Sequence, residues 1–180
     1  MARGIAEGPD ADFERIRWTL LGALACAHFS IRVVTPYFLP DLPLITALGV
    51  AALRGVQVDI LLPQQSDNPI IHWAMFGQIW QAIDAGCRVW LSAPPFDHTK
   101  LMLVDEEWAL FGSPNWDPRS LRLNFEFAVE CYDTHLAAQL SRLIEERIAS
   151  ATALTRADLD ARRLPIRLRD GVARLLMPYL

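Results

Sequence analysis

Cysteine is scarce in this 180-residue sequence, and long apolar runs are absent from it. Cys26, Cys87 and Cys131 are widely spaced, odd in number and set among apolar neighbours. That pattern excludes a disulfide framework and a cysteine zinc site, and it is typical of buried thiols in a reducing compartment. The best apolar run, residues 18–27, falls well short of the roughly 20 residues that cross a bilayer. The first residues also lack the layout of a signal peptide.

An excess of basic residues is missing as well. The formal net charge is −4, which disfavours sequence-independent binding to nucleic acid, because such binding relies on a basic surface. Residues 156–180 are an exception, with six arginines and three aspartates. A basic, partly apolar tail can lie on anionic lipid, or it can be the solvated face of a helix. The sequence leaves both interpretations open.

The rest of the composition is that of a folded globular protein. Apolar residues make up 52% of the chain and charged residues 21%. A domain of this length buries roughly 70% of its unfolded surface. We therefore expect one domain over residues 1–180, with a linker-like start over residues 1–9 and a helical C-terminal tail over residues 150–180 that breaks near Pro165.

The hydrophobic pattern alternates between helix and strand in the first half of the chain. Helices are expected from Asp10 or Asp12 to about residue 28, from Asp41 to about residue 54, and over residues 69–86; strands are expected over residues 30–35, 56–62 and 87–91. In the second half, residues 100–105 and 108–112 suit an antiparallel hairpin, followed by a strand over 124–132 and a helix over 133–150. This order predicts an α/β fold with a mixed, mostly parallel sheet flanked by helices on both faces.

Polar residues two positions apart recur three times in the second half. The pairs are His98 with Lys100, Ser113 with Asn115, and Asn124 with Glu126. In an extended segment, residues two apart point to the same face. If the three segments are neighbours in the sheet, the pairs form one polar cluster, whose members must satisfy one another or bind something.

Lys100 is the only lysine, beside 16 arginines. A compact ammonium differs from a planar guanidinium in size, hydration and hydrogen-bond geometry. A position that keeps lysine in an arginine-rich background, two residues after His98, indicates a specific requirement for the ammonium.

The segment around this lysine resembles a known family. Residues 96–105 fit the pattern His-x-Lys-x4-Asp, completed by His98, Lys100 and Asp105, and residues 112–115 follow as Gly-Ser-Pro-Asn. This is similar to the phospholipase D superfamily. Further stretches resemble the C-terminal half of bacterial cardiolipin synthases: residues 35–41, the loop with Ser66 and Asp67, residues 117–121, and 124–126.

The resemblance implies a role for each residue of the cluster. His98 would attack phosphorus or protonate the leaving oxygen, Lys100 and Asn115 would hold the non-bridging phosphate oxygens, and Ser113 would hydrogen-bond nearby. Glu126 would orient His98 through its other ring nitrogen. The chemistry is consistent, because an imidazole can form a phosphohistidine and a cation offsets the phosphoryl charge. The resemblance implies neither a cofactor nor a metal.

Three further residues belong to the candidate site. Asp105 completes the family pattern, but its strand parity is opposite to that of His98 and Lys100, so we interpret it as a supporting residue. Tyr37 can line the entrance for substrate or belong to the core. Asn124 is a candidate for substrate binding beside Glu126.

The implied function is phosphatidyl transfer of the cardiolipin synthase kind, with a phospholipid such as phosphatidylglycerol as substrate. Two alternatives stay open: a dimeric, metal-independent nuclease with a single motif, and an inactive or partner-dependent half. Hydrolysis in place of transfer is not distinguished by the sequence. Because the family uses two motifs and this chain has one, we expect either a homodimer or a second motif-bearing half. Peripheral association with the cytoplasmic side of a membrane is the expected location, and nucleic acid is disfavoured as a partner.

Overall fold

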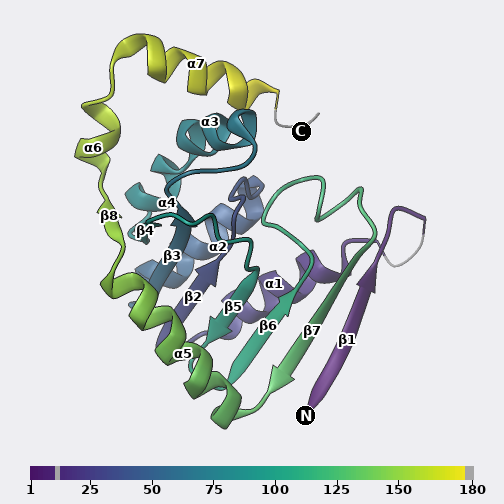
Figure 1. Ribbon diagram of the computed structural model, residues 1–180. Helices are drawn as coiled ribbons and strands as arrows, with labels where there is room; N and C mark the ends of the chain where they lie inside the picture. Colours follow the sequence, from purple (N-terminus) through teal and green to yellow (C-terminus); the bar gives the residue numbers. More distant parts are fainter. Residues whose placement is uncertain (11–12, 177–180) are drawn as a thin grey trace.

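The computed structural model describes residues 1–10 and 13–176 as a sheet with helices on both of its faces (Figure 1). The strands are β1 (Ala2–Glu7), β2 (Ser30–Val34), β3 (Gln57–Pro63), β4 (Arg88–Ser92), β5 (Leu101–Val104), β6 (Trp108–Gly112), β7 (Glu126–Tyr132) and β8 (Thr152–Leu154). The helices are α1 (Arg15–Cys26), α2 (Leu42–Leu53), α3 (Pro69–Gln78), α4 (Trp80–Asp84), α5 (Thr134–Ala149), α6 (Arg156–Asp160) and α7 (Leu164–Leu175).

The sheet is mixed, and its strands lie in the order β1-β7-β6-β5-β2-β3-β4-β8. Among the described strands, β2 pairs in parallel with β3, and β3 with β4, whereas every other pairing is antiparallel. The α/β class, the mixed sheet and the β5–β6 hairpin are as predicted. The expectation of mostly parallel pairing is wrong, because the chain crosses from β4 back to the other side of β2, where β5 pairs antiparallel and β6, β7 and β1 follow.

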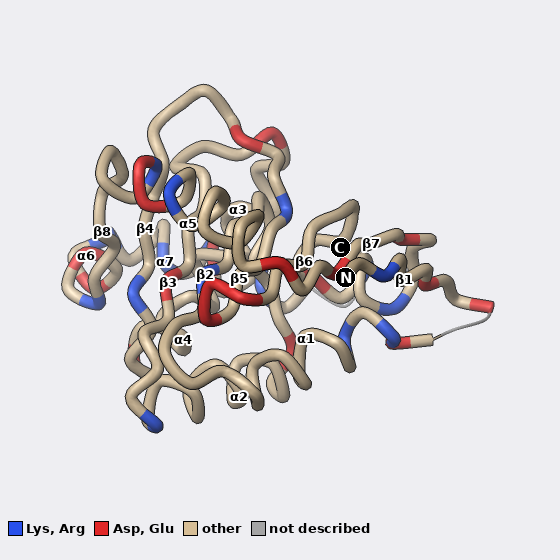
Figure 2. The backbone as a smooth tube through the Cα atoms, turned by 90° about the horizontal axis from the view of Figure 1, so that it is seen from below, with Lys and Arg blue, Asp and Glu red and all other residues tan. Residues whose placement is uncertain are grey.

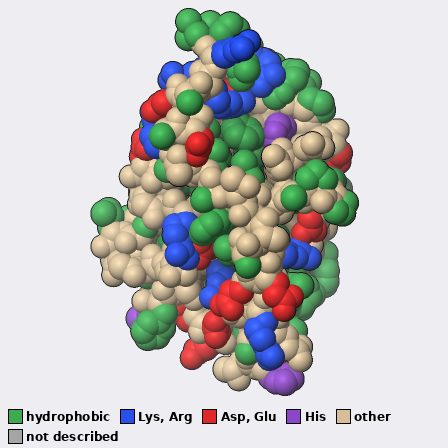
Figure 3. Space-filling model, turned by 60° about the vertical axis from the view of Figure 1, so that its left-hand side comes forward, with side chains coloured by type: hydrophobic (Ala, Val, Ile, Leu, Met, Phe, Trp, Pro, Cys, Tyr) green, Lys and Arg blue, Asp and Glu red, His purple; other side chains and the backbone are tan. Residues whose placement is uncertain are grey.

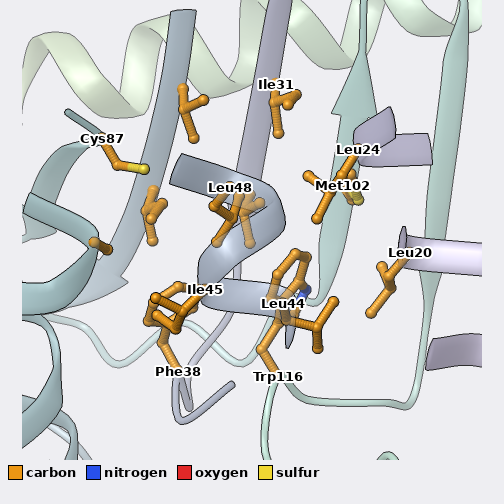
Figure 4. Close-up of a cluster of buried hydrophobic side chains, with 14 of the residues drawn as sticks. Leu20, Leu24, Ile31, Phe38, Leu44, Ile45, Leu48, Cys87, Met102 and Trp116 are labelled. Carbon is orange, nitrogen blue, oxygen red and sulfur yellow. The ribbon is translucent and has the colours of Figure 1, made fainter. Parts of the chain in front are cut away.

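Each face of the sheet has its own apolar core. Viewed from below, α1 and α2 lie along one side of the row of strands (Figure 2). Ile31 and Val33 point to this side, together with Leu24 and Leu48 from the helices (Figure 4). The next residue, Val34, points to the opposite side, as the two-residue period of a strand requires. There it packs with a smaller cluster that α5 closes with Ala137 and Ile144.

Several helices begin or end at the capping residues and glycines that the sequence indicated. The Asp41 side chain accepts a hydrogen bond from the Leu44 amide at 3.1 Å, so it caps α2 as predicted. Asp133 caps α5 in the same way, accepting from the amides of residues 135 and 136. Gly55 and Gly86 have φ values of +91° and +97°, which only glycine adopts at little cost, and they follow α2 and α4 directly.

The prediction of a linker over residues 1–9 is wrong for residues 2–7. These residues form β1, which pairs antiparallel with β7 at the edge of the sheet. Ile5 and Glu7 are buried because alternate residues of β1 face α1. Glu7 also accepts a hydrogen bond from the Ile16 amide at 2.5 Å, so a strand residue supplies an acceptor for the first turn of α1.

Other boundaries differ from the expectations. The helix N-cap is Glu14, with φ +59°, and not Asp10; Asp12 lies outside the described residues. The helix expected over 69–86 divides at Ile79 into α3 and α4. The tail contains α6 and α7 with a break before Pro165 as predicted, but it opens with the short strand β8, which pairs with β4.

Gly112, the last residue of β6, lies against the backbone of β7. A Cβ atom at this position would overlap the Phe127 carbonyl oxygen and approach the Ala128 Cα to 2.7 Å. Because backbone cannot rotate away as a side chain can, we expect Gly112→Ala to lower the free energy of unfolding by about 2 kcal/mol. Urea unfolding of the variant beside Gly22→Ala, where a Cβ would meet nothing, measures this. Equal midpoints for the two variants would contradict it.

Candidate active site

The polar pairs predicted from the sequence meet at one edge of the sheet, at the upper end of the strands in Figure 1. Lys100 directly precedes β5, Ser113 directly follows β6, and Glu126 begins β7. The Gly112 amide donates to the Lys100 carbonyl at 3.4 Å, and the Ser113 amide donates to the Phe127 carbonyl at 3.0 Å. These bonds across three adjacent strands bring the segments side by side, as the sequence predicted.

His98 and Lys100 are in direct contact. The Lys100 Nζ lies 2.9 Å from Nδ1 and 3.1 Å from Nε2 of the His98 ring, and it donates to the His98 carbonyl at 2.9 Å. The imidazole is exposed, whereas the lysine is half-buried. Burial lowers the Lys100 pKa, although the nearby carboxylates of Glu126 and Asp67 oppose that shift. An exposed imidazole beside a cation can receive an anionic phosphoryl group.

Glu126 is the buried carboxylate of the cluster and accepts hydrogen bonds from two of its other members. Its carboxylate accepts from the Ser113 hydroxyl in a short hydrogen bond and from the Asn124 side-chain Nδ2 at 3.1 Å. The Ser113 hydroxyl accepts from the Phe127 amide at 3.0 Å, which fixes its position. The structure therefore gathers Ser113, Asn124 and Glu126. In the described part of the chain, Glu126 makes no hydrogen bond to His98, although the family resemblance implies one.

Asn115 is half-buried, whereas Ser113, two residues before it, is exposed. Its amide nitrogen is 3.3 Å from the Ser120 hydroxyl, and its buried side-chain oxygen has no hydrogen-bond partner. The loop is closed by Asp117, which accepts from the Ser120 amide at 2.8 Å. Burial raises the pKa of the Asp117 carboxyl, and the charge of Glu126 adds to the rise. A buried amide oxygen without a hydrogen-bond partner costs free energy.

Tyr37 is half-buried and lies beside His98. Its ring stands edge-on to the His98 ring at a centroid distance of 6.0 Å. Its hydroxyl donates to Asp67 at 2.6 Å. Burial and this hydrogen bond raise the Tyr37 pKa, and the same bond lowers the pKa of Asp67. The centroid of the Phe96 ring lies 5.7 Å from that of the His98 ring, so two aromatic rings flank the imidazole.

Asp105 lies at the opposite end of β5 from His98 and Lys100. Its carboxylate accepts from the backbone amides of His28 at 2.7 Å, Phe29 at 2.7 Å and Ser30 at 2.8 Å. Burial by itself raises the Asp105 pKa, but these bonds outweigh it and the net shift is downward. The structure thus separates Asp105 from the cluster and places it as the anchor of the turn that enters β2.

Sequence reasoning missed Glu7, which lies next to Glu126 across the β1–β7 pairing. Burial raises the Glu7 pKa, and the charges of Glu14 and Glu126 add to the rise. One Glu7 oxygen is buried without a hydrogen-bond partner. The two-residue spacing of Ile5 and Glu7 was the one sequence signal for a strand here, and the interpretation of residues 1–9 as a linker passed over it.

No group of three or more His, Cys, Asp or Glu side chains is arranged to hold a metal ion within residues 1–10 and 13–176. No helix in that part of the chain has the length and apolar character needed to span a bilayer.

Comparison with known proteins gives consistent matches. Residues 20–148 match the family described as "Cardiolipin synthase, PLD-like domain". The chain is 35% identical over 175 residues to a cardiolipin synthase of Staphylococcus aureus, which covers 97% of this chain and 35% of that protein. It is 36% identical over 176 residues to the major cardiolipin synthase ClsA of Bacillus subtilis, covering 98% of this chain and 36% of that protein. The chain therefore spans about a third of the length of these curated relatives.

Solved structures share the fold. The Salmonella typhimurium protein Nuc, a phospholipase D family member, superimposes with a TM-score of 0.71 at 22% identity, covering 86% of this chain and 99% of Nuc. Phosphatidylserine synthase of Haemophilus influenzae superimposes with a TM-score of 0.75 at 17% identity, covering 99% of this chain and 48% of the synthase.

Proposed function

This chain belongs to the family of phospholipase D-like domains of cardiolipin synthases, and from that premise we propose that it transfers phosphatidyl groups through His98. The observation that carries the proposal is the contact of the exposed His98 ring with the Lys100 ammonium, at the edge where Ser113 and Glu126 meet. This edge combines a nucleophile, a cation and a carboxylate, which are the groups that phosphodiester transfer requires.

In the proposed reaction, a neutral His98 nitrogen attacks the phosphorus of a phospholipid such as phosphatidylglycerol. A nitrogen–phosphorus bond forms as the bond from phosphorus to the headgroup oxygen breaks, and the leaving alcohol takes a proton from an acid. A second alcohol then attacks the phosphorus and gives its proton to the same group, which is now a base, as the nitrogen–phosphorus bond breaks and frees His98. Lys100 and Asn115 hold the non-bridging oxygens, Tyr37 and Asn124 border the headgroup, and Glu126 sets the local charge.

The acid is assigned to a second motif-bearing half. This chain covers about a third of its curated relatives, and it holds one such cluster among its described residues. A second copy of this chain, related by a twofold axis, or a different half can each bring a histidine to face His98. Hydrolysis to phosphatidic acid follows when water replaces the second alcohol.

The proposal also places the chain at the cytoplasmic side of a membrane. Because the proposed substrate is a membrane lipid, the edge of the sheet that carries His98 must reach the surface of a bilayer. The free state of Cys26, Cys87 and Cys131 is compatible with a reducing compartment.

The ammonium of Lys100 gives a testable pH dependence. Because burial lowers its pKa, the cation is lost at a lower pH than in a free lysine, and activity should fall on the alkaline side. We expect Lys100→Arg to reduce kcat/KM by about 100-fold, since a planar guanidinium does not fit the site of a compact ammonium. The residual activity of that variant should lack the alkaline decline, because a guanidinium stays protonated. A profile from about pH 7 to about pH 11 measures both effects, and an unchanged alkaline limb would contradict the assignment.

The function is tested by incubating the purified chain with phosphatidylglycerol vesicles and identifying the lipid products by mass spectrometry, beside His98→Ala. Cardiolipin or phosphatidic acid that depends on His98 is the expected result. A folded wild-type sample that forms neither lipid product, alone or with a cardiolipin synthase half added, would overturn the proposal. Cleavage of plasmid DNA by the same sample would move the assignment to a nuclease.

A further inference from the structure

Helix α7 carries a row of exposed apolar side chains. Leu164, Leu168, Val172 and Leu175 are 66%, 61%, 60% and 76% exposed. Their spacing of four, four and three residues places them on one face of the helix. Single exposed leucines are common, but a continuous row over the whole helix is typical of a surface that meets another apolar phase.

Exposed arginines border this row on one side. Arg163 and Arg167 lie along that flank of the helix, whereas the Arg169 guanidinium is held by Asp170 and by the Trp73 ring of α3. The top of Figure 3, where α7 lies, shows hydrophobic and basic side chains next to one another. A leucine row flanked by arginines matches the boundary of an anionic bilayer, with the leucines in the acyl region and the guanidinium groups at the phosphates.

The opposite face of α7 is fixed to the body of the protein. Ala173 and Asp170 are buried, and Asp170 forms ion pairs with Arg162 and Arg169 at 2.7 Å each. A Cβ on Gly77 of α3 would lie 2.6 Å from the Asp170 carbonyl oxygen, so the two helices are in close contact. Arg169 also stacks over the Trp73 ring of α3 at 4.4 Å. The orientation of the leucine row relative to the domain is therefore set by packing.

In Figure 1, α7 lies on the same side as the upper ends of the strands, with α3 between. α7 packs on α3, and α3 begins at Pro69, directly after the loop in which Asp67 binds the Tyr37 hydroxyl beside His98. α3 therefore connects the helix that carries the leucine row to the loop beside the imidazole.

We propose that α7 is an interfacial helix that docks this chain on a bilayer containing anionic phospholipid. The proposal deepens the proposed function, on which it rests for the choice of phosphatidylglycerol as the lipid. The partner is a lipid surface and not a second protein chain, because the exposed arginines beside the row, Arg163 and Arg167, complement the lipid phosphates. Docking presents the active-site edge to phosphodiester groups at the same interface.

Sedimentation with vesicles tests the proposal. Leu168→Glu should reduce binding to vesicles of mixed phosphatidylglycerol and phosphatidylcholine by about tenfold or more, because a charge would replace a leucine that docking places in the acyl region. Binding of the wild-type chain should weaken with added salt and on pure phosphatidylcholine. The matched control is Leu53→Glu, since Leu53 is 86% exposed at the end of α2 and the neighbouring Arg54 bonds the carbonyls that precede β2, away from the site edge.

The outcomes separate this proposal from the proposed function. Vesicle binding is measured in the His98→Ala background, so a chain without turnover still reports on α7. On monomeric short-chain phosphatidylglycerol, Leu168→Glu should keep wild-type activity while losing activity on vesicles. Equal binding by wild type and Leu168→Glu would overturn the proposal. So would a dimer, seen by light scattering, that Leu168→Glu converts to monomer while vesicle binding stays unchanged, since a second copy would then cover the row.

Discussion

Replacing His98 by alanine is expected to lower lipid turnover by at least about 1,000-fold, with little effect on folding. The imidazole is exposed, and among the described residues its ring nitrogens hydrogen-bond to Lys100 alone, which also donates to the His98 carbonyl, so removing the ring leaves the Lys100 ammonium with a partner. The reaction, however, loses the atom to which phosphorus would be bonded. Product formation is measured by mass spectrometry on phosphatidylglycerol vesicles, and the urea midpoint is measured on the same samples.

His135→Ala is the matched control, because His135 is also exposed but lies on α5 with Gln139 as its side-chain partner. It should retain wild-type turnover. A direct readout is the covalent intermediate: wild type quenched in acid-free denaturant should carry a phosphatidyl group on a peptide containing His98. An active wild type that loses less than tenfold on removal of His98 would exclude it as the nucleophile.

Replacing Asp105 by alanine is expected to lower the free energy of unfolding by about 3 kcal/mol. Three backbone amides would lose a charged acceptor, and each such hydrogen bond contributes roughly 1 kcal/mol or more. Asp105 also has φ +52°, where alanine is less well tolerated than aspartate or asparagine. Asp105→Asn keeps one oxygen acceptor and the tolerance for this φ, so it should lose about half as much. Urea unfolding at neutral pH compares the variants, and a loss below about 1 kcal/mol for alanine would contradict the anchoring role.

The lowered pKa of Asp105 fixes the pH dependence of this stabilisation. A carboxyl whose folded pKa lies below the unfolded value of about 3.9 stabilises the fold fully above that value. The contribution is lost as the pH falls through the folded pKa. The stability difference between wild type and Asp105→Asn should therefore shrink in acid, below about pH 4. A difference that grew toward acid pH would reverse the assignment.

The sequence predicted the central elements well because local signals and tertiary packing agree there. Asp41, Gly55 and Gly86 mark helix ends by their own capping and backbone chemistry. β1 could not be predicted, because its six residues gain their stability from β7, more than a hundred positions away. The division at Ile79 and the strand β8 likewise depend on tertiary packing that leaves little trace in periodicity.

The site was predictable to the level of which segments meet. Lys100, Ser113 and Glu126 meet because each lies at the end of its strand, and the antiparallel register brings these three ends together. Asp105 is separate from the cluster, because it follows β5 at the other end of that strand. The partners of each side chain could not be predicted: Asp67 reaches Tyr37 from the loop after β3, and Ser120 reaches Asn115 within a turn. These contacts depend on loop conformations that no periodic pattern encodes.

The edge strand β1 affects how readily the protein aggregates. β1 satisfies the outer backbone groups of β7, and Gly4 and Gly8 lie against the rings of Phe127 and Phe125, which are still 54% and 77% exposed. A chain shortened to begin after Glu7 would uncover the hydrogen-bonding row of β7 beside two phenylalanines. Those are the conditions for strand addition between molecules and for aggregation. The first seven residues therefore protect the sheet against self-association, in addition to any part they play beside Glu126.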